Sequence, residues 1–522
     1  MTTADTLPED AASLRALALS LLAERDELTH RVAAMHQIIH QLQRAQFGRR
    51  SEKLDPDQLQ LALEEREIAA AREAAAVEKQ EKAPRRKAEP GQRKSLPSHL
   101  PRIEVVIEPE DKSCPCCRGA MHVIGEETSQ RLDVIPAQFR ILVTRRPKYA
   151  CRACVGPIVQ APAPERLIRS GLPTEALVAH VLVSKYAWHL PLYRQAQILM
   201  AQGIAIDRSV LAFWVGYAAA ELMPLWQRMR EILLGSARLF VDETRAPVLD
   251  PGRGRTKTGY FWSIARDDRP WRGGTGPPAV VYTYAPGRGA KHATALLAGY
   301  CGIVQCDGYA AYKQLADPRR AGGAVTLAFC WAHWRRYFYE IAKGGPAPIA
   351  DEALRRIAAL YAVEATIRGR DAEERRAVRQ AESKPLIEDL KGWLEAQLAR
   401  ASRKSVIAAA IRYGLNHWEG LNRFLEDGRI EIDTNIVERS MRPIGLSRKN
   451  ALFAGHDAGA ANWACLASLI ETCKLNGVNP EAYLTDVLSK LVNLWPASRL
   501  DELMPWAWAP VNATPAPLEA AA

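Results

Sequence analysis

The 522-residue sequence lacks long apolar runs. No run approaches the roughly 18 apolar residues that a membrane-spanning helix requires, so we expect no helix that crosses a membrane and no membrane partner. The first residues, MTTADTLPED, are polar and acidic and lack the features of a signal peptide. Without an export signal, the ten cysteines are expected to bind metal or to remain free thiols rather than to form disulfides.

The composition excludes a mostly disordered chain, because 48% of the residues are hydrophobic and 25% are charged. A single core rarely exceeds roughly 250–300 residues, so the length predicts two or more domains. The net charge of +11 favours an anionic partner such as nucleic acid. This charge is uneven: residues 1–80 are acidic, and the basic excess begins at residues 81–100.

The first segment carries a heptad pattern of apolar residues. Its two series are Leu14, Leu21, Leu28, Met35 and Leu42, and, four residues after each of the first four, Ala18, Arg25, Val32 and Ile39. A narrow apolar stripe of this kind is typical of a coiled coil and predicts a homo-oligomer. Packing of one amphipathic helix onto its own protein is the alternative. The basic, proline-containing stretch that follows is expected to be a linker, either solvated or in contact with phosphate.

Two C-x2-C pairs, Cys114 with Cys117 and Cys151 with Cys154, form the strongest metal motif in the sequence. Thiolates two residues apart can face one ion, and two such pairs make the closed tetrahedral site of structural Zn²⁺. Cys116 could replace Cys117 as a ligand. Four reduced structural cysteines are the alternative.

A β-rich stretch, residues 139–149, lies between the two pairs and predicts a hairpin that carries the second one. Its Arg145 and Arg146 are candidates for DNA contact. The next segment, residues 173–234, reads as a helix, a break at Gly203 and a second helix capped by Asp207 or Ser209. A helix–turn–helix-like DNA-binding unit is one interpretation, and an ordinary helical subdomain is the other.

Three β-rich runs, within residues 236–249, 258–268 and 277–286, predict a meander. A helix and a fourth strand follow, and residues 324–343 read as a strand running into a helix. Asp242 lies in the first strand and Asp307 at the end of the fourth. Two aspartates in these places match the way a ribonuclease-H-like fold builds a metal site.

A third acid is expected from a later helix, where Glu438 is the candidate. Carboxylates with open water positions favour Mg²⁺, and two ions suit a phosphodiester substrate. His333 and the basic residues after Glu438 are candidates for holding the DNA backbone: Arg439, Arg442, Arg448 and Lys449.

The stretch between the second and third acids contains long amphipathic patterns, which predict an all-α insertion over residues 345–430. Trp393 and Trp418 within it are expected to belong to its core. Glu243 should point to the strand face opposite Asp242. Cys330 and His333 have metal-like spacing, but as a pair they lack the other two ligands of a zinc site.

Five stretches together resemble the DDE-type transposase of the insertion sequence sixty-six family: VDET (241–244), CDGYAAY (306–312), CWAHWRRYFYE (330–340), DTNIVERSMRPIGLSRKNALFAG (433–455) and SLIETCKLNGVNPEAYLTDVL (468–488). The resemblance implies that Asp242, Asp307 and Glu438 are the catalytic triad and magnesium ligands. It also implies small accessory proteins from the same element. Thr434 departs from the D-N-N that usually precedes the glutamate helix in this family. Cys116 departs from the C-P-x-C-G pattern that is usual in the family's first cysteine pair.

The expected fold class is multidomain α+β, with a coiled coil, a zinc-ribbon-like module, a helical DNA-binding segment and a ribonuclease-H-like catalytic core with its all-α insertion. The expected boundaries are arm 10–80, linker 81–101, zinc module 102–165, helical segment 166–235, catalytic domain 236–455, C-terminal helical domain 456–508 and disordered tail 509–522.

The resemblance implies Mg²⁺-dependent cleavage at the ends of an insertion sequence and transfer of the 3′-OH strands into double-stranded target DNA. A bacterial cytoplasmic location, at the nucleoid when DNA is bound, is expected with it. Two other functions stay open: a catalytically inactive DNA-binding regulator, and a metal-dependent nuclease that does not join strands.

Overall fold

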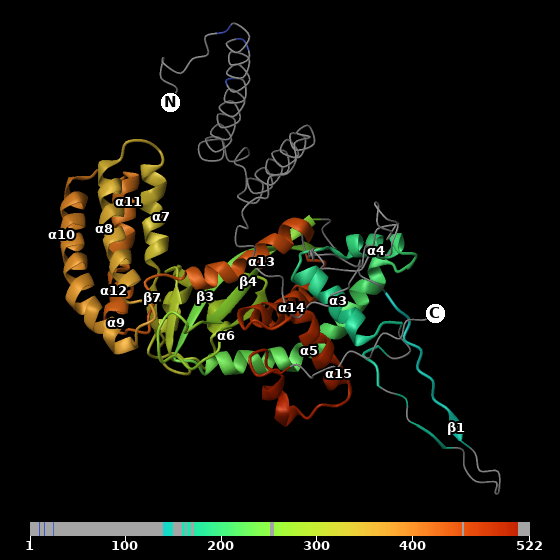
Figure 1. The fold of residues 1–522 in the computed structure, drawn as a ribbon. Coiled ribbons are helices and arrows are strands. Elements are labelled where there is room, and N and C mark those ends of the chain that lie inside the picture. The colour runs from blue at the N-terminus through green and yellow to red at the C-terminus, as the bar shows by residue number, and fades with distance from the viewer. Residues whose placement is uncertain are drawn as a thin grey trace, which may run out of the picture. The chain divides into compact units, whose positions relative to one another are not determined.

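A computed structural model gives the structure of the protein, and it falls into two units, Met1–Val143 and Thr144–Ala522. The structure describes residues 10, 15, 25, 139–149, 159–161, 163, 165–168, 172–250, 255–451 and 454–509. The expected coiled-coil seam apart from Arg25, the linker, the four cysteines of the C-x2-C pairs and the tail from residue 510 lie outside the described residues. All helices and strands below belong to the second unit (Figure 1).

The core is a five-stranded mixed sheet with the order β5-β4-β3-β6-β7. Its strands are β3 (Arg238–Asp250), β4 (Arg255–Arg266), β5 (Ala279–Ala285), β6 (Ile303–Cys306) and β7 (Thr326–Phe329). The first three pair in antiparallel fashion, which confirms the predicted meander, and β6 and β7 run parallel to β3. Leu239, Phe240 and Val241 are fully buried, so the first part of β3 is covered on both faces.

The register of the sheet decides which way Asp242 points. Asp242 lies opposite Ser263 on β4, and Ser263 lies opposite Tyr282 on β5, so the three side chains share one face. The Tyr282 hydroxyl donates to the carbonyl of Ser440 in α13 (Asn435–Ala451), which crosses the sheet in Figure 1. Asp242 therefore lies on the face that α13 covers.

The opposite face meets α6 (Ala290–Leu296) and η3 (Ala310–Ala316). Trp262 lies beside Glu243 in the register, and its ring stands edge-on to Tyr312 of η3 at 6.0 Å. Glu243 accepts a hydrogen bond from the Tyr312 hydroxyl. Glu243 thus points away from Asp242, as predicted from the alternation of side chains along a strand.

The outer edge of β5 is covered by α14 (Asp457–Leu475) through two buried hydroxyl groups. The backbone N–H of Tyr282 donates to Ser468 Oγ at 2.8 Å, and the N–H of Val280 donates to Thr472 Oγ1 at 3.1 Å. Unpaired edge groups are costly when buried, so these side chains take the place of a sixth strand. A further helix, α15 (Pro480–Val492), packs beside α14.

Residues 345–430, all of which the structure describes, contain helices and no strand. The helices are α8 (Pro348–Thr366), α9 (Ala372–Val378), α10 (Lys384–Arg400), α11 (Val406–Asn416) and α12 (Trp418–Asn422), which form a bundle with α7 (Trp331–Ala342) (Figure 1). Trp331, Trp334 and Phe338 are buried at its centre. Trp393 and Trp418 pack against this core, which confirms their predicted role.

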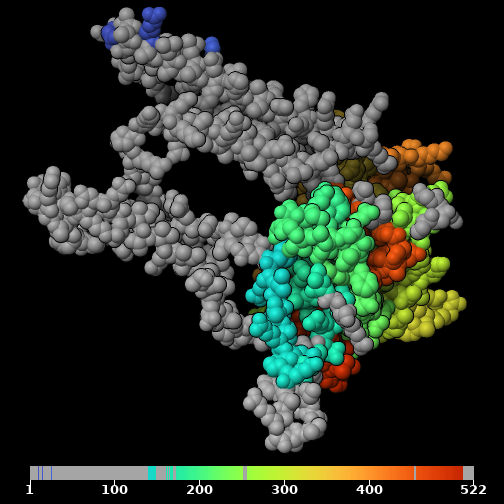
Figure 2. Space-filling model, turned by 90° about the vertical axis from the view of Figure 1, so that its right-hand side faces the viewer, coloured from blue at the N-terminus to red at the C-terminus, as the bar shows by residue number. Residues whose placement is uncertain are grey.

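The segment before the sheet forms α3 (Glu175–Tyr186), α4 (Leu192–Ala201) and α5 (Arg208–Leu234). The prediction of one continuous helix before Gly203 is wrong, because the chain leaves the helical conformation at residues 187–191. His189 adopts a positive φ of 58° there. The break at Gly203 (φ 79°) is confirmed, and Asp207 caps α5 by accepting from the N–H of Ser209. In Figure 2 these helices, coloured teal to green, cover much of the face toward the viewer.

By length and composition alone, α5 is long and apolar enough to cross a membrane, which corrects the expectation that the chain has no such helix. The sequence concealed this because polar residues such as Glu221 interrupt the apolar run. In the structure, Leu211, Leu222 and Leu225 of α5 are fully buried, and the helix packs against α14. A core helix of a folded domain meets the same criteria, so α5 is accounted for without a membrane.

A short antiparallel pair, β1 (Lys148–Tyr149) and β2 (Val159–Gln160), flanks the second cysteine pair in the sequence and confirms the predicted hairpin in part. Of the β-rich stretch 139–149, residues 148–149 form a strand and residues 139–147 do not. Arg146 Nε donates to the carbonyl of Ala161 at 2.9 Å, which continues the link between the two arms.

We predict that Ser468→Ala destabilises the core, because the buried N–H of Tyr282 then loses its acceptor. Leaving a buried donor unsatisfied costs about 1–3 kcal/mol. Urea unfolding should show a lower midpoint for this variant. Ser489→Ala on the exposed side of α15 is the control and should match the unaltered protein. Equal midpoints for all three proteins would contradict the role of the hydroxyl.

Candidate active site

Asp242 is half-buried in β3 and accepts a hydrogen bond from the backbone N–H of Glu243 at 2.9 Å. Burial raises its pKa from the ordinary 3.8 to about 7, and the negative charges of Glu243 and Asp307 contribute to the rise. Protonated His333 acts in the other direction. The carboxyl group of Asp242 therefore lies in a buried, negatively charged environment whose charge the protein does not fully compensate.

Asp307 follows the last residue of β6 directly. Because Phe240 pairs with Gln305 in parallel register, Asp307 extends from β6 at the level of Asp242 on β3. The N–H of Tyr309 donates to Asp307 Oδ1 at 2.8 Å, and the Tyr413 hydroxyl donates to its carbonyl at 2.7 Å. The sheet thus brings the two predicted aspartates together.

Glu438 lies in the first turn of α13, and buried side chains anchor the chain that leads into this helix. Gln305 of β6 donates to the carbonyl of Glu431 at 2.8 Å and accepts from its N–H at 3.0 Å. The carbonyl of Ile432 accepts from the N–H of Trp331 at 3.1 Å. The strand that ends at Asp307 is therefore tied to the start of the glutamate helix.

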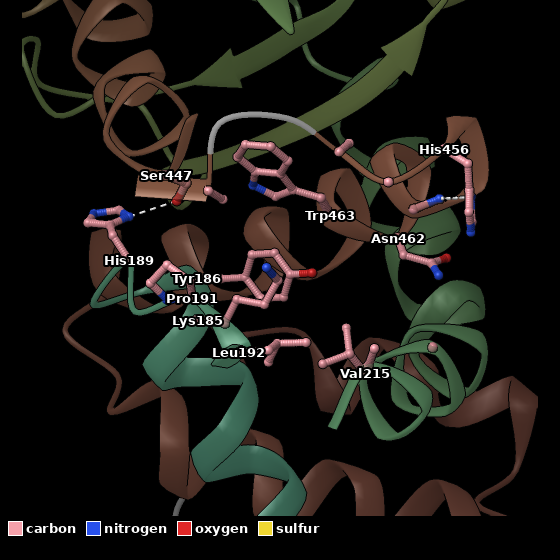
Figure 3. Close-up of a pocket in the computed structure, with 16 residues that line it drawn as sticks. Lys185, Tyr186, His189, Pro191, Leu192, Val215, Ser447, His456, Asn462 and Trp463 are labelled. Atoms are coloured by element: carbon pink, nitrogen blue, oxygen red, sulfur yellow. Dashed lines mark hydrogen bonds between the residues drawn. The ribbon is translucent and has the colours of Figure 1, made fainter. Parts of the chain in front are cut away.

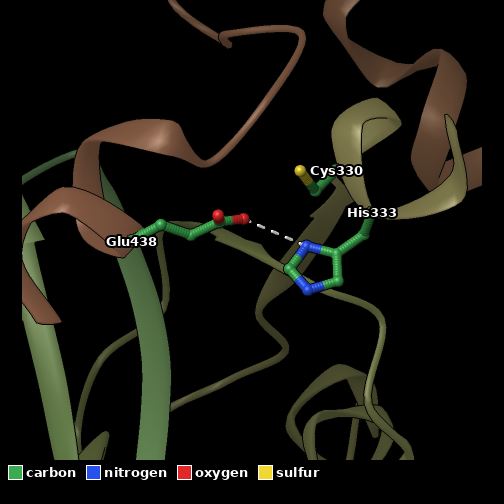
Figure 4. Close-up of side chains that lie close together, drawn as sticks. All are labelled: Cys330, His333 and Glu438. Atoms are coloured by element: carbon green, nitrogen blue, oxygen red, sulfur yellow. Dashed lines mark ion pairs between the residues drawn. The ribbon is translucent and has the colours of Figure 1, made fainter. Parts of the chain in front are cut away.

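The Glu438 carboxylate is directed toward α7 (Figure 4). His333 Nδ1 lies 3.3 Å from Glu438 Oε1, and a nitrogen of Arg336 lies 3.9 Å from Oε2. The hydrogen bond with His333 lowers the pKa of Glu438, and the charges of Arg336 and Arg442 add to this. Among the described residues, the ligand atoms of Cys330, His333 and Glu438 lie within 4.8 Å of one another, whereas Asp242 and Asp307 are not part of that group.

His333 is the positive centre among these acids. Its close contacts with Cys330 and then with Glu438 raise the pKa of His333 to about 10, in spite of burial. Its Nδ1 is buried but makes no well-aligned hydrogen bond, so the 3.3 Å contact with Glu438 is an ion pair of imperfect geometry. The expectation that Cys330 and His333 have no further ligand beside them is wrong, because folding brings Glu438 to the pair.

Glu243 is the fourth acid near the site, and its own partners neutralise it. Its side chain is fully buried, Arg288 Nε donates to it at 2.5 Å, and Tyr312 donates as well. The Arg288 guanidinium in turn stacks on Tyr309 at 3.9 Å. Glu243 is thus held as a structural carboxylate, although its charge still raises the pKa of Asp242.

The predicted DNA-contacting residues occupy different surfaces. On α13, Arg439, Arg442 and Lys449 are exposed, and half-buried Arg448 donates to the carbonyl of Arg245.

Arg145 is exposed, and Arg146 is half-buried at the base of the hairpin. Arg336 was not predicted from the sequence as a residue of the site. It lies one helical turn after His333 on the same face of α7. The three-residue spacing in HWRR was the available signal.

A cavity of about 320 Å³ lies beside the C-terminal half of α13 (Figure 3). Lys185, Tyr186 and Trp463 line it. At its edge, His189 Nδ1 lies 2.7 Å from Ser447 Oγ. This contact fastens the turn between α3 and α4 to the helix that carries the third acid.

The donor set suits a hard divalent cation. Asp242 and Asp307 offer carboxylate oxygens, the ligands that Mg²⁺ prefers. The raised pKa of Asp242 marks negative charge that a bound cation would compensate. The side chain of Glu438 is paired with His333 and is not grouped with the aspartates.

Comparison with known proteins gives four family matches along the chain. They are described as Transposase IS66 family (residues 170–462), IS66 C-terminal element (468–506), zinc-finger binding domain of transposase IS66 (111–155) and Transposase C of IS166 homeodomain (34–105). The zinc-finger match includes both cysteine pairs.

Two similar chains come from Sinorhizobium fredii. Uncharacterized protein y4jD is 44% identical over 515 residues, which cover 97% of each chain. Uncharacterized protein y4qI is 43% identical over 538 residues, covering 97% of this chain and 98% of the relative.

We predict that Asp242→Asn stabilises the protein in the absence of added divalent metal. Folding raises the pKa of Asp242, so the contribution of this group to the free energy of unfolding is fully present below pH 3.8. That contribution is lost as the pH rises through about 7. The variant lacks this loss and should be about 2–4 kcal/mol more stable above pH 7. Urea unfolding of both proteins at several pH values tests it. A difference that does not grow with pH would contradict the assigned pKa.

Proposed function

The chain belongs to the IS66 family of DDE-type transposases, and we propose that it is an active enzyme that cleaves the ends of an insertion sequence and joins them to target DNA. The observation that carries this proposal is the placement of three acids. Asp242 and Asp307 lie side by side on the sheet, and Glu438 lies on the helix that covers the same face.

We assign residues 236–455 to a ribonuclease-H-like catalytic domain with the helical insertion 345–430. Supporting this is the strand order, with three antiparallel strands followed by two strands parallel to the first. Residues 456–508 form the proposed C-terminal helical domain, which contains the match to the IS66 C-terminal element.

Asp242, Asp307 and Glu438 would hold two Mg²⁺ ions. Bound magnesium supplies charge stabilisation at the attacking and leaving oxygens of a phosphodiester. Water attacks the phosphorus at the element's end, the bridging P–O bond breaks, and a 3′-OH is released. That hydroxyl then attacks a phosphodiester of the target, so that one P–O bond forms as another breaks. The three carboxylates orient the reacting groups, and no bond to the protein forms.

The basic residues on α13 and α7 would hold the DNA backbone. Arg442 and Arg336 both lie close enough to Glu438 to lower its pKa. Arg439 and Lys449 continue the exposed positive surface along α13, with Arg448 beside them. His333 would contact a phosphate near the acids.

The helical segment 166–235 is proposed to bind DNA as well. It exposes aromatic side chains on α4 and α5, including Tyr193, Phe213 and Tyr217. Arg145 and Arg146 of the hairpin would add phosphate contacts beside the zinc-finger domain.

The zinc-finger domain would bind one structural Zn²⁺ through Cys114, Cys117, Cys151 and Cys154. The predicted coiled coil of the N-terminal arm, residues 10–80, would join copies of the chain into a homo-oligomer. Double-stranded DNA is the proposed partner, both as element ends and as target, together with small accessory proteins of the same element. The proposed location is the bacterial cytoplasm, at the nucleoid when DNA is bound.

One observation favours a second candidate, a DNA-binding regulator without catalytic activity. Glu438 is paired with His333 rather than grouped with the aspartates. The regulator would bind element ends without metal-dependent cleavage. Incubating purified protein with labelled ends and a target plasmid, with and without Mg²⁺, separates the candidates, because a nuclease alone would cleave without joining.

We predict that Asp242→Asn, Asp307→Asn and Glu438→Gln each lower cleavage and joining by about 10³-fold or more, because the acids act as one unit. Binding of element ends should persist. Asp317→Asn is the control and should retain activity, since its one charged partner among the described residues is exposed Arg319. Full activity of any triad variant in the gel assay would refute the assignment.

We predict that Cys114→Ser combined with Cys151→Ser removes one equivalent of zinc per chain, because each cysteine pair loses a ligand. Binding of element ends should weaken through the loss of the zinc-finger fold. Zinc content measured by mass spectrometry tests this. Cys465→Ser, a buried cysteine of α14, is the matched control. Unchanged zinc content in the double variant would rule out the predicted ligands.

A further inference from the structure

We propose that Cys330, His333 and Glu438 form a second transition-metal site, for Zn²⁺ or an ion of similar softness, and that this ion competes with Mg²⁺ for Glu438. The competition rests on the proposed magnesium site, whereas the second site itself does not. This site is distinct from the cysteine pairs of the zinc-finger domain.

The fold brings these three residues together from distant parts of the chain. Cys330 immediately precedes α7, His333 lies in the first turn of that helix, and Glu438 lies in the first turn of α13. One ligand atom from each lies within 4.8 Å of the other two. His333 Nδ1 and Glu438 Oε1 are 3.3 Å apart, the separation expected for two ligands of one tetrahedral ion at about 2.0–2.1 Å.

The chemistry of the donors selects the metal. A thiolate, an imidazole and a carboxylate are the ligand types that bind Zn²⁺, whereas Mg²⁺ takes oxygen ligands. Thiolate and carboxylate together carry two negative charges, which match a divalent ion. Three protein ligands leave a fourth position for water.

The surroundings of the cysteine suit a metal thiolate. Cys330 is buried, and the backbone N–H of Thr434 donates to its sulfur at 3.3 Å. Hydrogen bonds to ligating groups orient them and tune the metal. His333 Nδ1 is buried and makes no well-aligned hydrogen bond, so an ion can replace its proton without breaking such a bond. His333 and Glu438 are about a quarter exposed, which leaves an entry path from solvent.

The position of Glu438 links this site to catalysis. Its carboxylate faces His333 here (Figure 4), in a group of ligand atoms that does not include Asp242 or Asp307. In this proposal the carboxylate binds one of the two sites at a time. Zinc at Cys330 and His333 would therefore hold the enzyme in a state with an incomplete triad.

The site is tested first by metal content. The unaltered full-length protein should hold two zinc equivalents per chain, and Cys330→Ser and His333→Ala should each hold one. Cys473→Ser is the matched control, because Cys473 is equally buried but lies on α14, and it should hold two. Two equivalents in Cys330→Ser would overturn the site.

A second measurement guards against zinc-content changes caused by misfolding. In the Cys114→Ser/Cys151→Ser protein loaded with Co²⁺, the sulfur-to-metal charge-transfer absorption should disappear on adding Cys330→Ser and persist on adding Cys473→Ser. Glu438→Gln should weaken Co²⁺ binding by about tenfold or more. Persistence of the absorption without Cys330 would refute the thiolate ligand.

Competition is measured by the same absorption. Saturating Mg²⁺ should weaken Co²⁺ binding by about the same factor as Glu438→Gln, and Asp242→Asn should abolish this effect. Co²⁺ affinity that is independent of Mg²⁺ would overturn the competition. These measurements do not involve DNA cleavage, so an inactive protein would contradict the proposed function and leave the second site standing.

Discussion

Buried negative charge within β3 and directly after the end of β6 is the constraint on which the site depends. Two parallel strands place the carboxylates of Asp242 and Asp307 at the same level, and Glu243 adds a third on the other face. The protein neutralises Glu243 with Arg288 and Tyr312, and it pairs Glu438 with His333. Asp242 is left undercompensated, and its raised pKa is the physical sign of this. Such an arrangement is expensive in a metal-free protein and is the kind that a divalent cation stabilises.

The helical bundle helps to position the residues of this site. Its first helix, α7, carries His333 and Arg336, and its core tryptophans hold that helix in place. After the bundle, the chain returns to the sheet at Glu431, where Gln305 binds both its N–H and its carbonyl. A long insertion therefore ends within hydrogen-bond distance of the strand that precedes Asp307. The position of Glu438 follows from that return.

Much of the fold was predictable because its signals are local. β-rich composition identified the three antiparallel strands, and amphipathic periodicity identified the helices of the insertion. Asp207 as the cap of α5 followed from residue type. The break at residues 187–191 had a sequence signal that the prediction overlooked, namely Pro191, which cannot continue a helix and restricts the residue before it. The apolar length of α5 was missed because isolated polar residues interrupt its run, although its buried face is continuous.

By itself the sequence determined the candidate acids, the cysteine pairs and the family resemblance, since these depend on residue type and spacing along the chain. Only the tertiary structure decided which groups meet. The pairing of β3 with β6 sets Asp242 beside Asp307, and the return of the chain at Glu431 brings Glu438 to Cys330 and His333. That last contact joins residues about a hundred positions apart. No local pattern encodes such a distance, because it results from the packing of the whole bundle against the sheet.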